Sequence, residues 1–267
     1  MVYADLHAHT TRSDGEMEPD EVADVARDAG VSVVAVTDHD RVPPFSGVVS
    51  RDEITLIAGI ELRVETDDER VDLLGYGVES TDALERECER LQQDRMDRGR
   101  RIVECVEDYC GVSLDIELTD NIGRPHIARA IDAHPDIDVD YRGAFAELIG
   151  DDCPCYVSRD VTQFERGRDL LDEAAAVVGL AHPFRYDDPA AALALTDRLD
   201  AVELHYPYGF ETDDAPIRDA VAANDLLATG GTDAHEHELG VAGLSRDQFE
   251  PVADALGIDR AVLPPGA

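Results

Sequence analysis

The sequence predicts an α/β fold built on a parallel sheet or barrel. Short apolar runs of strand length recur along the 267 residues and are separated by segments with helical spacing. About seven such runs are visible, and alternation of strands with helices is typical of parallel sheets. Most runs stop at a histidine or an acidic residue, so the predicted strand ends also carry the candidate chemistry.

The first expected strand, residues 2–6, leads into His7. A helix is expected over residues 19–29, because its apolar side chains recur on one face and Gly30 follows its last turn. The remaining apolar runs are bounded by polar or turn-forming residues, which is typical of strands. These expected strands are residues 31–36, 54–60, 71–76, 177–181, 201–204 and 226–229.

Residues 82–168 have a different character from the rest of the chain. They are rich in charged residues, have few continuous apolar runs and show mostly helical spacing. We therefore expect one domain over residues 1–267, interrupted by a cap-like helical insertion at about residues 82–168.

The charge of the chain excludes several functions. Its 60 acidic and 23 basic residues give a formal net charge of −37, and every basic residue is arginine because the chain has no lysine. Without a basic surface we expect no binding to duplex DNA at low salt. The missing lysine excludes Schiff-base chemistry, a Walker-type phosphate loop and a metal site bridged by carbamylated lysine.

The acidic residues are spread along the whole chain, which favours a protein adapted to a salt-rich cytoplasm, as in a halophilic archaeon. At about 1 M salt the Debye length is about 3 Å, so the self-repulsion of such a surface is largely screened. No apolar run reaches the roughly 20 residues that span a bilayer, and no secretory signal is visible. We expect a cytoplasmic protein without membrane contact, whose five cysteines are reduced.

Two pairs of side chains have the spacing of metal ligands. His7 and His9 are two residues apart and project from the same side of an extended chain, and Asp233 and His235 repeat this spacing. Imidazole and carboxylate together favour Zn²⁺, Mn²⁺ or Fe²⁺ rather than Ca²⁺. Three more residues of these types stand at strand ends, namely His39, Glu61 and His182. The sequence therefore predicts a metal site, whereas His134 and His237 are expected at the surface and His205 lacks a paired ligand.

Six motifs resemble, in order and spacing, those of the PHP (polymerase and histidinol phosphatase) phosphoesterases. They are DLHAHTTRSDG (5–15), VTDHD (36–40), GIE (59–61), GRPHIARAI (123–131), LAHP (180–183) and GGTDAH (230–235). The resemblance covers essentially the whole chain and points to the small stand-alone group that acts on nucleotide phosphates. It implies a distorted seven-stranded (β/α)7 barrel that holds two or three divalent metals, Mn²⁺, Fe²⁺ or Zn²⁺.

The resemblance also implies which residues hold these metals. The first metal would be held by His7, His9, Glu61 and Asp233; the second by Glu61, His126 and His182; the third by Asp14, His39 and His235. Asp72 stands where relatives often have histidine, so this position departs from the family pattern.

The expected reaction is the attack of a metal-bridging hydroxide on a phosphoryl group. Glu61, His235 and Arg124 are the candidate catalytic residues. Because the chain has no lysine, arginine must neutralise the rest of the substrate charge. The candidates for this are Arg124, Arg159 and Arg185, with Arg12 a weaker one.

We therefore expect a metal-dependent phosphoesterase acting on a phosphomonoester of a small substrate. The substrate would be a nucleotide (AMP or a 3′,5′-bisphosphonucleotide) or the end of a short oligonucleotide. A histidinol-phosphate phosphatase is the alternative of the same class, and an inactive PHP barrel retained as a binding module is the alternative of another class. A binuclear amidohydrolase is disfavoured, because its common form needs the carbamylated lysine that this chain lacks. The oligomeric state cannot be read from the sequence.

Overall fold

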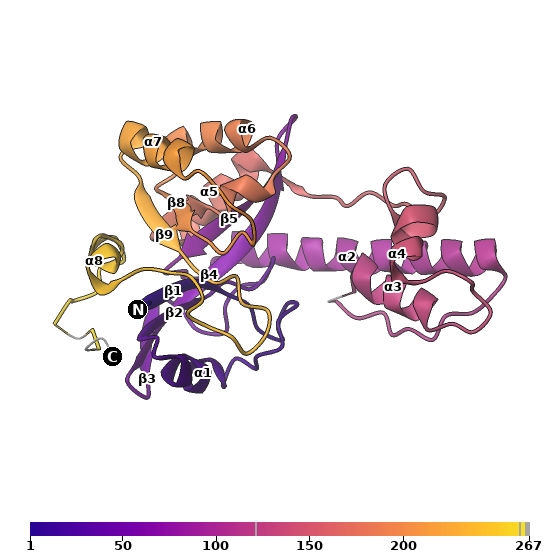
Figure 1. Cartoon of the computed structure of the whole chain (residues 1–267), viewed down its shortest axis with the longest axis horizontal. Helices are drawn as coiled ribbons and strands as arrows, with labels where there is room; N and C mark the ends of the chain where they lie inside the picture. The colour runs from indigo at the N-terminus through magenta and orange to yellow at the C-terminus, as the bar shows by residue number, and fades with distance from the viewer. Residues whose placement is uncertain (121, 262, 265–267) are drawn as a thin grey trace. The chain divides into compact units, whose positions relative to one another are not determined.

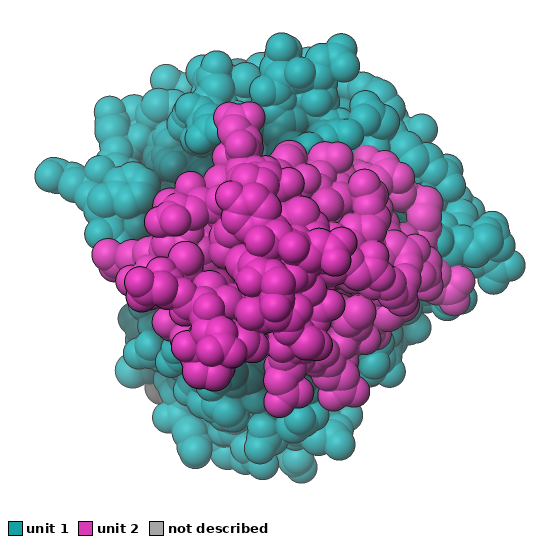
Figure 2. Space-filling view, turned by 90° about the vertical axis from the view of Figure 1, so that its right-hand side faces the viewer, with its two compact units in different colours: residues 1–88, 162–267 teal, residues 89–161 magenta. Residues whose placement is uncertain are grey.

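The computed structural model describes residues 1–120, 122–261 and 263–264, which divide into two compact units. Unit 1 comprises residues 1–88 and 162–267, and unit 2 comprises residues 89–161 (Figure 2). The candidate metal ligands therefore fall mostly in unit 1, while His126, Arg124 and Arg159 belong to unit 2.

Unit 1 is built on one sheet, and seven of its strands follow each other in the order β1-β2-β4-β5-β7-β8-β9 (Figure 1). Two short strands, β3 and β6, pair with β4 beside this path. The strands are β1 Ala4–Ala8, β2 Val33–Val36, β3 Val48–Arg51, β4 Ile54–Glu65, β5 Arg70–Tyr76, β6 Thr162–Gln163, β7 Val177–Leu180, β8 Ala201–His205 and β9 Leu227–Gly230. The predicted α/β class with a seven-stranded barrel-like sheet is confirmed.

The sheet curls so that the chain after β9 meets β1. Ala8 and Ala234 form a parallel bridge, and the backbone N–H of His9 donates to Ala234 over 2.9 Å. A Cβ at Gly231 would lie only 2.4 Å from Cβ of His7, so glycine permits this close approach. The buried carboxylate of Asp5 accepts hydrogen bonds from the N–H groups of Thr232 (2.9 Å) and Gly240 (2.8 Å). Residues 5–9 and 231–240 thus lie side by side although they are far apart in the sequence.

The sheet is not parallel throughout, because β5 runs antiparallel to both β4 and β7. Only residues 66–69 connect β4 to β5, with Thr66 donating to Glu69 over 2.8 Å, and so short a link joins antiparallel strands. β4 is also longer than the predicted residues 54–60. Glu61 therefore lies inside this strand rather than after its end.

Helices cover the sheet of unit 1. α1 begins three residues later than predicted, buries Val22, Ala23 and Ala26, and ends at Gly30, whose φ of 72° suits glycine. α8 begins with a capping box between Ser245 and Gln248. The helices confined to unit 1 are α1 Val22–Ala29, α5 Phe164–Ala174, α6 Pro189–Ala194, α7 Ala215–Asn224 and α8 Arg246–Ala255, with 3-10 turns at Pro183–Arg185 and Leu195–Arg198. No helix within the described residues is long and apolar enough to cross a membrane.

Unit 2 is mostly helical and has its own apolar core. α2, Asp82–Cys110, begins in unit 1 and continues into unit 2, followed by α3 Arg124–Asp132, α4 Tyr141–Gly143 and a π-helical turn at Ala144–Ile149. Val106, Ile127, Ile131 and Ile149 are among the wholly buried side chains of this core. Such burial gives unit 2 a hydrophobic stabilisation of its own.

The expectation that all five cysteines are reduced is wrong for Cys105 and Cys155, which form a disulfide within unit 2. These residues are 50 positions apart in the sequence, and the fold brings their Cα atoms to 5.5 Å. That distance lies in the usual range for a disulfide, but nothing in the spacing of the cysteines reveals it. Cys88, Cys110 and Cys153 are free.

Candidate metal centre

The backbone of unit 1 takes unusual conformations where several candidate ligands stand. His7 lies in β1 and His9 just after it, and both side chains are wholly buried. His182 follows β7 with a φ of 27°, and Asp233 follows β9 with a φ of 56°. Positive φ in residues other than glycine costs free energy and clusters at functional sites. Two candidate ligands that follow strands, His182 and Asp233, therefore have a strained backbone.

The first ligand group consists of His7, His9, Glu61 and Asp233, whose ligand atoms all lie within 4.8 Å of one another. His7 Nε2 is 3.3 Å from Glu61 Oε2 and 3.4 Å from Asp233 Oδ1. His9 Nε2 is 3.3 Å and 3.0 Å from the same two oxygens. The four residues predicted for the first metal are thus brought together.

Several atoms of this group are buried and, within the described residues, have no hydrogen-bond partner: His7 Nε2, both ring nitrogens of His9 and Glu61 Oε2. A buried polar atom without a partner costs about 1–3 kcal/mol, so native proteins rarely leave several of them together. A divalent cation would satisfy these atoms at once. The donor set of imidazoles and carboxylates suits Mn²⁺, Fe²⁺ or Zn²⁺.

A second ligand group is formed by His9, Asp14, His39 and His235. Asp14 is 3.4 Å from His235 Nε2 and 3.8 Å from His39 Nε2. His39 Nδ1 is also 3.0 Å from Glu61 Oε2. Asp14, His39 and His235 are all partly exposed, so this group lies on the solvent side of the cluster. These are the three residues that the family resemblance assigned to one metal.

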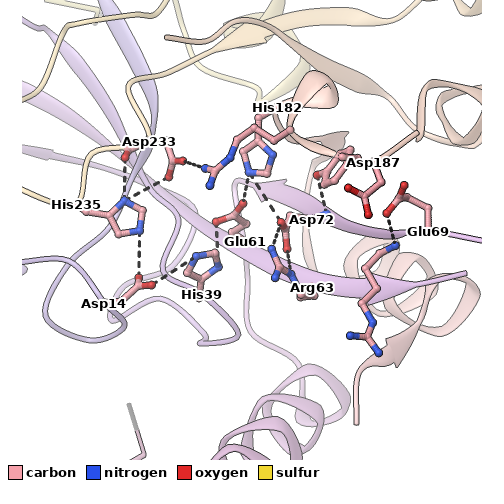
Figure 3. A pocket seen from close by; sticks show the side chains of 13 residues that line it. Asp14, His39, Glu61, Arg63, Glu69, Asp72, His182, Asp187, Asp233 and His235 are labelled. Carbon is pink, nitrogen blue, oxygen red and sulfur yellow. Dashed lines mark hydrogen bonds and ion pairs between the residues drawn. The ribbon is translucent and has the colours of Figure 1, made fainter. Parts of the chain in front are cut away.

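A third ligand group is formed by Glu61, Asp72 and His182 (Figure 3). His182 Nε2 is 3.0 Å from Glu61 Oε1 and 3.9 Å from Asp72 Oδ2. His126, which was expected beside Glu61 and His182, stands at the start of α3 in unit 2. It belongs to none of the three groups found among the described residues. The sequence analysis assigned no role to Asp72, and the structure places it in this third ligand group.

The charges around Glu61 influence the protonation of the ligand residues. Burial opposes ionisation of Glu61, but the charges of His39 and His7 outweigh it and hold the pKa of this carboxyl well below its usual range. Burial lowers the pKa of His39. Burial opposes protonation of His9 as well, yet the nearby carboxylates of Asp233 and Glu61 raise its pKa to about 10. In the absence of a cation, His9 would therefore carry a proton at neutral pH.

Metal binding at neutral pH is expected to release at least one proton per chain. His9, with a pKa of about 10, must lose its proton to become a ligand, so the apparent metal affinity should rise with pH up to that value. Titration calorimetry in two buffers of different ionisation enthalpy measures this release. An observed enthalpy that is the same in both buffers would contradict the prediction.

Glu203 is a functional candidate that the sequence analysis missed. It lies on β8, is wholly buried, and its Oε1 is 3.2 Å from His7 Nδ1. Its other oxygen accepts a hydrogen bond from the backbone N–H of His182 over 2.8 Å. A carboxylate behind a ligating histidine fixes the orientation and tautomer of the ring. The signal in the sequence was an acidic residue inside the apolar run AVELH.

A cavity of about 360 Å³ opens beside the ligand groups. Arg185 lines it, and its Nη1 donates to Asp233 Oδ2 (2.9 Å) and to the hydroxyl of Tyr206 (2.8 Å). Arg63 and Arg70 also line the cavity, although the sequence analysis did not select them. The cavity therefore combines carboxylates and imidazoles with three guanidinium groups.

The other predicted arginines are Arg124, Arg159 and Arg12. Arg124 and Arg159 belong to unit 2, where Arg124 donates to Asp151 over 3.1 Å. Arg12 donates to the carbonyl of Val42 over 3.1 Å and is absent from the cavity lining. The remaining histidines, His134, His205 and His237, are in no ligand group of the described residues.

Comparison with known proteins adds sequence relatives to this geometry. The chain is 27% identical over 197 residues to a 3′,5′-nucleoside bisphosphate phosphatase of Chromobacterium violaceum, covering 70% of this chain and 69% of the relative. It is 27% identical over 250 residues to a phosphoribosyl 1,2-cyclic phosphate 1,2-diphosphodiesterase of Eggerthella lenta, covering 86% and 93%. A 5′-3′ exoribonuclease Rnm of Salmonella typhimurium is 28% identical, with coverage of 70% and 67%. The relatives thus carry the names of phosphoric ester hydrolases.

Solved structures and a family model agree on the fold. A candidate metal-dependent phosphoesterase from Bifidobacterium adolescentis matches with a TM-score of 0.75 and 24% identity, covering 97% of each chain. A structure from Chromobacterium violaceum described as an amidohydrolase with bound sulfate has a TM-score of 0.73 and 22% identity, covering 95% of this chain and 96% of that one. The family model described as PHP domain matches residues 5–134. The resemblance predicted from the sequence motifs is therefore confirmed: residues 5–134 match the PHP domain, and the sequence relatives carry the names of phosphoric ester hydrolases.

Proposed function

We propose that this protein is a metal-dependent phosphoric ester hydrolase that releases phosphate from a nucleotide or from the end of a short oligonucleotide. The observation that carries the proposal is Glu61, a buried carboxylate close to histidines of all three ligand groups, beside an arginine-lined cavity. Relatives named as a bisphosphate phosphatase and an exoribonuclease support this substrate class.

The residues divide the work as follows. His7, His9, Glu61 and Asp233 would hold one metal, and Asp14, His39 and His235 another. Glu61 and His182 would share the remaining position, to which the family resemblance also assigned His126. Bound divalent metals lower the pKa of a water ligand and neutralise charge on a phosphoryl group. Glu61 and His235 would thus act in catalysis as ligands.

Arginine would orient the substrate. Arg185 already binds Asp233, and one face of its guanidinium lies against Tyr206 with a 6.0 Å separation from the ring centroid. These two contacts hold the planar guanidinium of Arg185 beside the ligand groups. A guanidinium can donate two parallel hydrogen bonds, which suits phosphate oxygens. The roles expected for Arg124 and Arg159, which belong to unit 2, stay predictions from the sequence.

A phosphate-release screen tests the proposal. Purified protein in about 1 M KCl with Mn²⁺ is given AMP, a 3′,5′-bisphosphonucleotide, short 5′-phosphorylated RNA and histidinol phosphate. Release from the nucleotide substrates supports the proposal, and release from histidinol phosphate alone would favour the alternative phosphatase. Absence of release from every compound, with nucleotide binding retained, would instead indicate a binding module.

Hydrolysis of a cyclic phosphodiester is a second candidate function. The Eggerthella lenta relative named for this activity aligns over 93% of its own length, more than the bisphosphate phosphatase. Adding a phosphoribosyl 1,2-cyclic phosphate to the screen distinguishes the two, because ring opening gives a monoester before any phosphate is released. Product analysis by ³¹P NMR detects that monoester directly.

Adaptation to high salt remains a prediction from the net charge of −37. The midpoint of thermal unfolding should rise between about 0.1 M and about 1 M KCl, because the Debye length falls from about 10 Å to about 3 Å and screens the acidic surface. Differential scanning fluorimetry measures the shift. A midpoint that is unchanged or lower in high salt would contradict the prediction.

A further inference from the structure

We propose that an aromatic ladder, made of Tyr206, Tyr208 and Phe210, is the platform on which the base of a nucleotide substrate stacks. The ladder follows β8, and its first ring contacts Arg185, which lines the cavity beside the ligand groups. This inference rests on the proposed function and deepens it, because it names the part of the substrate that is recognised besides the phosphoryl group. It predicts a preference for phosphate esters that carry a heterocyclic base over those of a bare sugar.

The three rings of the ladder form a continuous row. The ring centroids of Tyr206 and Tyr208 are 4.7 Å apart, and those of Tyr208 and Phe210 are 5.7 Å apart. Gly209, with a φ of 72°, makes the bend between the last two rings, a conformation that suits glycine. The backbone N–H of Phe184 donates to the hydroxyl of Tyr208 over 3.3 Å. The row is therefore held in place by the backbone and by this hydrogen bond.

The inner end of the ladder is tied to the candidate metal centre, and its outer end is open to solvent. The Tyr206 hydroxyl donates to Asp233 Oδ2 and accepts from Arg185 Nη1, both over 2.8 Å. The centroid of the same ring is 5.3 Å from that of the His182 imidazole. Phe210 is 60% exposed and continues the row of rings, whereas a single exposed apolar side chain would need no explanation. The ladder therefore leads from the ligand groups to the protein surface.

A nucleobase suits the ladder better than a further phosphate group. Stacking on aromatic rings stabilises any base, because every base has a π-face. The ladder is followed in the chain by Glu211, Asp213 and Asp214, which would repel a second phosphate there. At the inner end, Arg185 supplies positive charge for the phosphoryl group. This charge distribution matches a substrate whose phosphate enters the cavity and whose uncharged base lies toward solvent.

Steady-state kinetics test the proposal with the nucleotide that the phosphate-release screen finds to react fastest. F210L and Y208L keep apolar bulk but remove a ring, and each should raise the KM about fivefold or more. The effect should fall on KM rather than on kcat, because the base stacks before the reaction as well as during it. F210Y and Y208F keep the ring and should restore the wild-type KM.

A fluorescent nucleotide analogue measures stacking without turnover. The methylenephosphonate of 2-aminopurine riboside cannot release phosphate, because its P–C bond resists hydrolysis, and the emission of 2-aminopurine falls when it stacks on a ring. The chain has no tryptophan, so this emission is recorded with little contribution from the protein. F210L and Y208L should need about fivefold more protein than wild type for half of the quenching.

Y109L is the matched control, because Tyr109 is as exposed as Phe210, 64% against 60%, but belongs to unit 2 and not to the ladder. Y109L should keep both the KM and the quenching of wild type. Wild-type values of both in F210L and Y208L would overturn the proposal. Ribose 5-phosphate hydrolysed by wild type as efficiently as the nucleotide would overturn it as well, and the phosphoesterase function would stand in both cases.

The remaining outcomes separate the ladder from other roles. If F210L and Y208L weakened the binding of histidinol phosphate but not of the nucleotide, the ladder would be a site for a cation, and the proposal would be overturned. If wild type quenched the analogue through the ladder but released phosphate from no nucleotide, the proposed function would fail and the stacking platform would stand. F210L changes an exposed side chain, so it remains informative even if Y208L does not fold.

Discussion

Replacing His9 with alanine is expected to reduce phosphate release by roughly a thousandfold or more, which corresponds to about 4 kcal/mol of lost transition-state stabilisation. His9 is a member of two of the three ligand groups. Its Nε2 faces Glu61 and Asp233, and its Nδ1 lies 3.9 Å from Asp14. One substitution therefore removes a donor from two neighbouring positions. Phosphate release and bound metal are measured on the same preparation.

His237 provides the matched control for this experiment. It is exposed, lies 3.5 Å from Glu21 and belongs to no ligand group of the described residues. H237A should keep both turnover and metal content. If H9A turned over its substrate like wild type, the assignment of the first ligand group would be wrong, whatever the effect of H237A.

Replacing Glu61 with glutamine is expected to remove more than one metal per chain and to abolish turnover. The substitution keeps the shape of the side chain but removes the charge that faces four imidazoles: those of His7, His9, His39 and His182. The amide NH₂ also places donors where the metals need an acceptor. The loss should match or exceed that of H9A, because Glu61 is close to all three groups. Plasma mass spectrometry and phosphate release measure the two effects.

The outcome for E61Q is read against E69Q, which removes a charge from the same cavity. E69Q should keep its bound metals and its folded structure. A variant E61Q that bound as much metal as wild type would show that the carboxylate is not a shared ligand. Circular dichroism of both variants separates loss of metal from loss of fold.

Local spacing predicted the ligands that lie on one stretch of chain. The i, i+2 pairs His7/His9 and Asp233/His235 follow from the alternation of an extended backbone. Their meeting at one edge requires the strands to curl until the chain after β9 reaches β1, and the Ala8–Ala234 bridge shows that they do. The apolar runs along the sequence predicted a sheet or barrel, and the family resemblance implied a seven-stranded barrel.

Contacts that depend on strand register were not predictable in the same way. Asp72 faces Arg63 because β5 runs antiparallel to β4, whereas the alternation of strands and helices favoured parallel neighbours. Glu203 reaches His7 across the sheet, over 196 positions of sequence. The Cys105–Cys155 disulfide depends on the tertiary packing of unit 2 in the same manner. Each of these contacts depends on strand pairing or tertiary packing, which cannot be determined from a single sequence.

The closure of the sheet has a consequence for the order in which the protein is made. Asp5 accepts hydrogen bonds from Thr232 and Gly240, and His9 Nε2 lies 3.0 Å from Asp233 Oδ1, so residues 5–9 have partners more than two hundred positions later in the chain. A ribosome adding residues from the N-terminus exposes His7 and His9 long before Asp233 and His235 exist. Until Asp233 and His235 are added, the first ligand group lacks one of its carboxylates and the second lacks one of its imidazoles. The metal centre can therefore be completed only after these two residues have been synthesised.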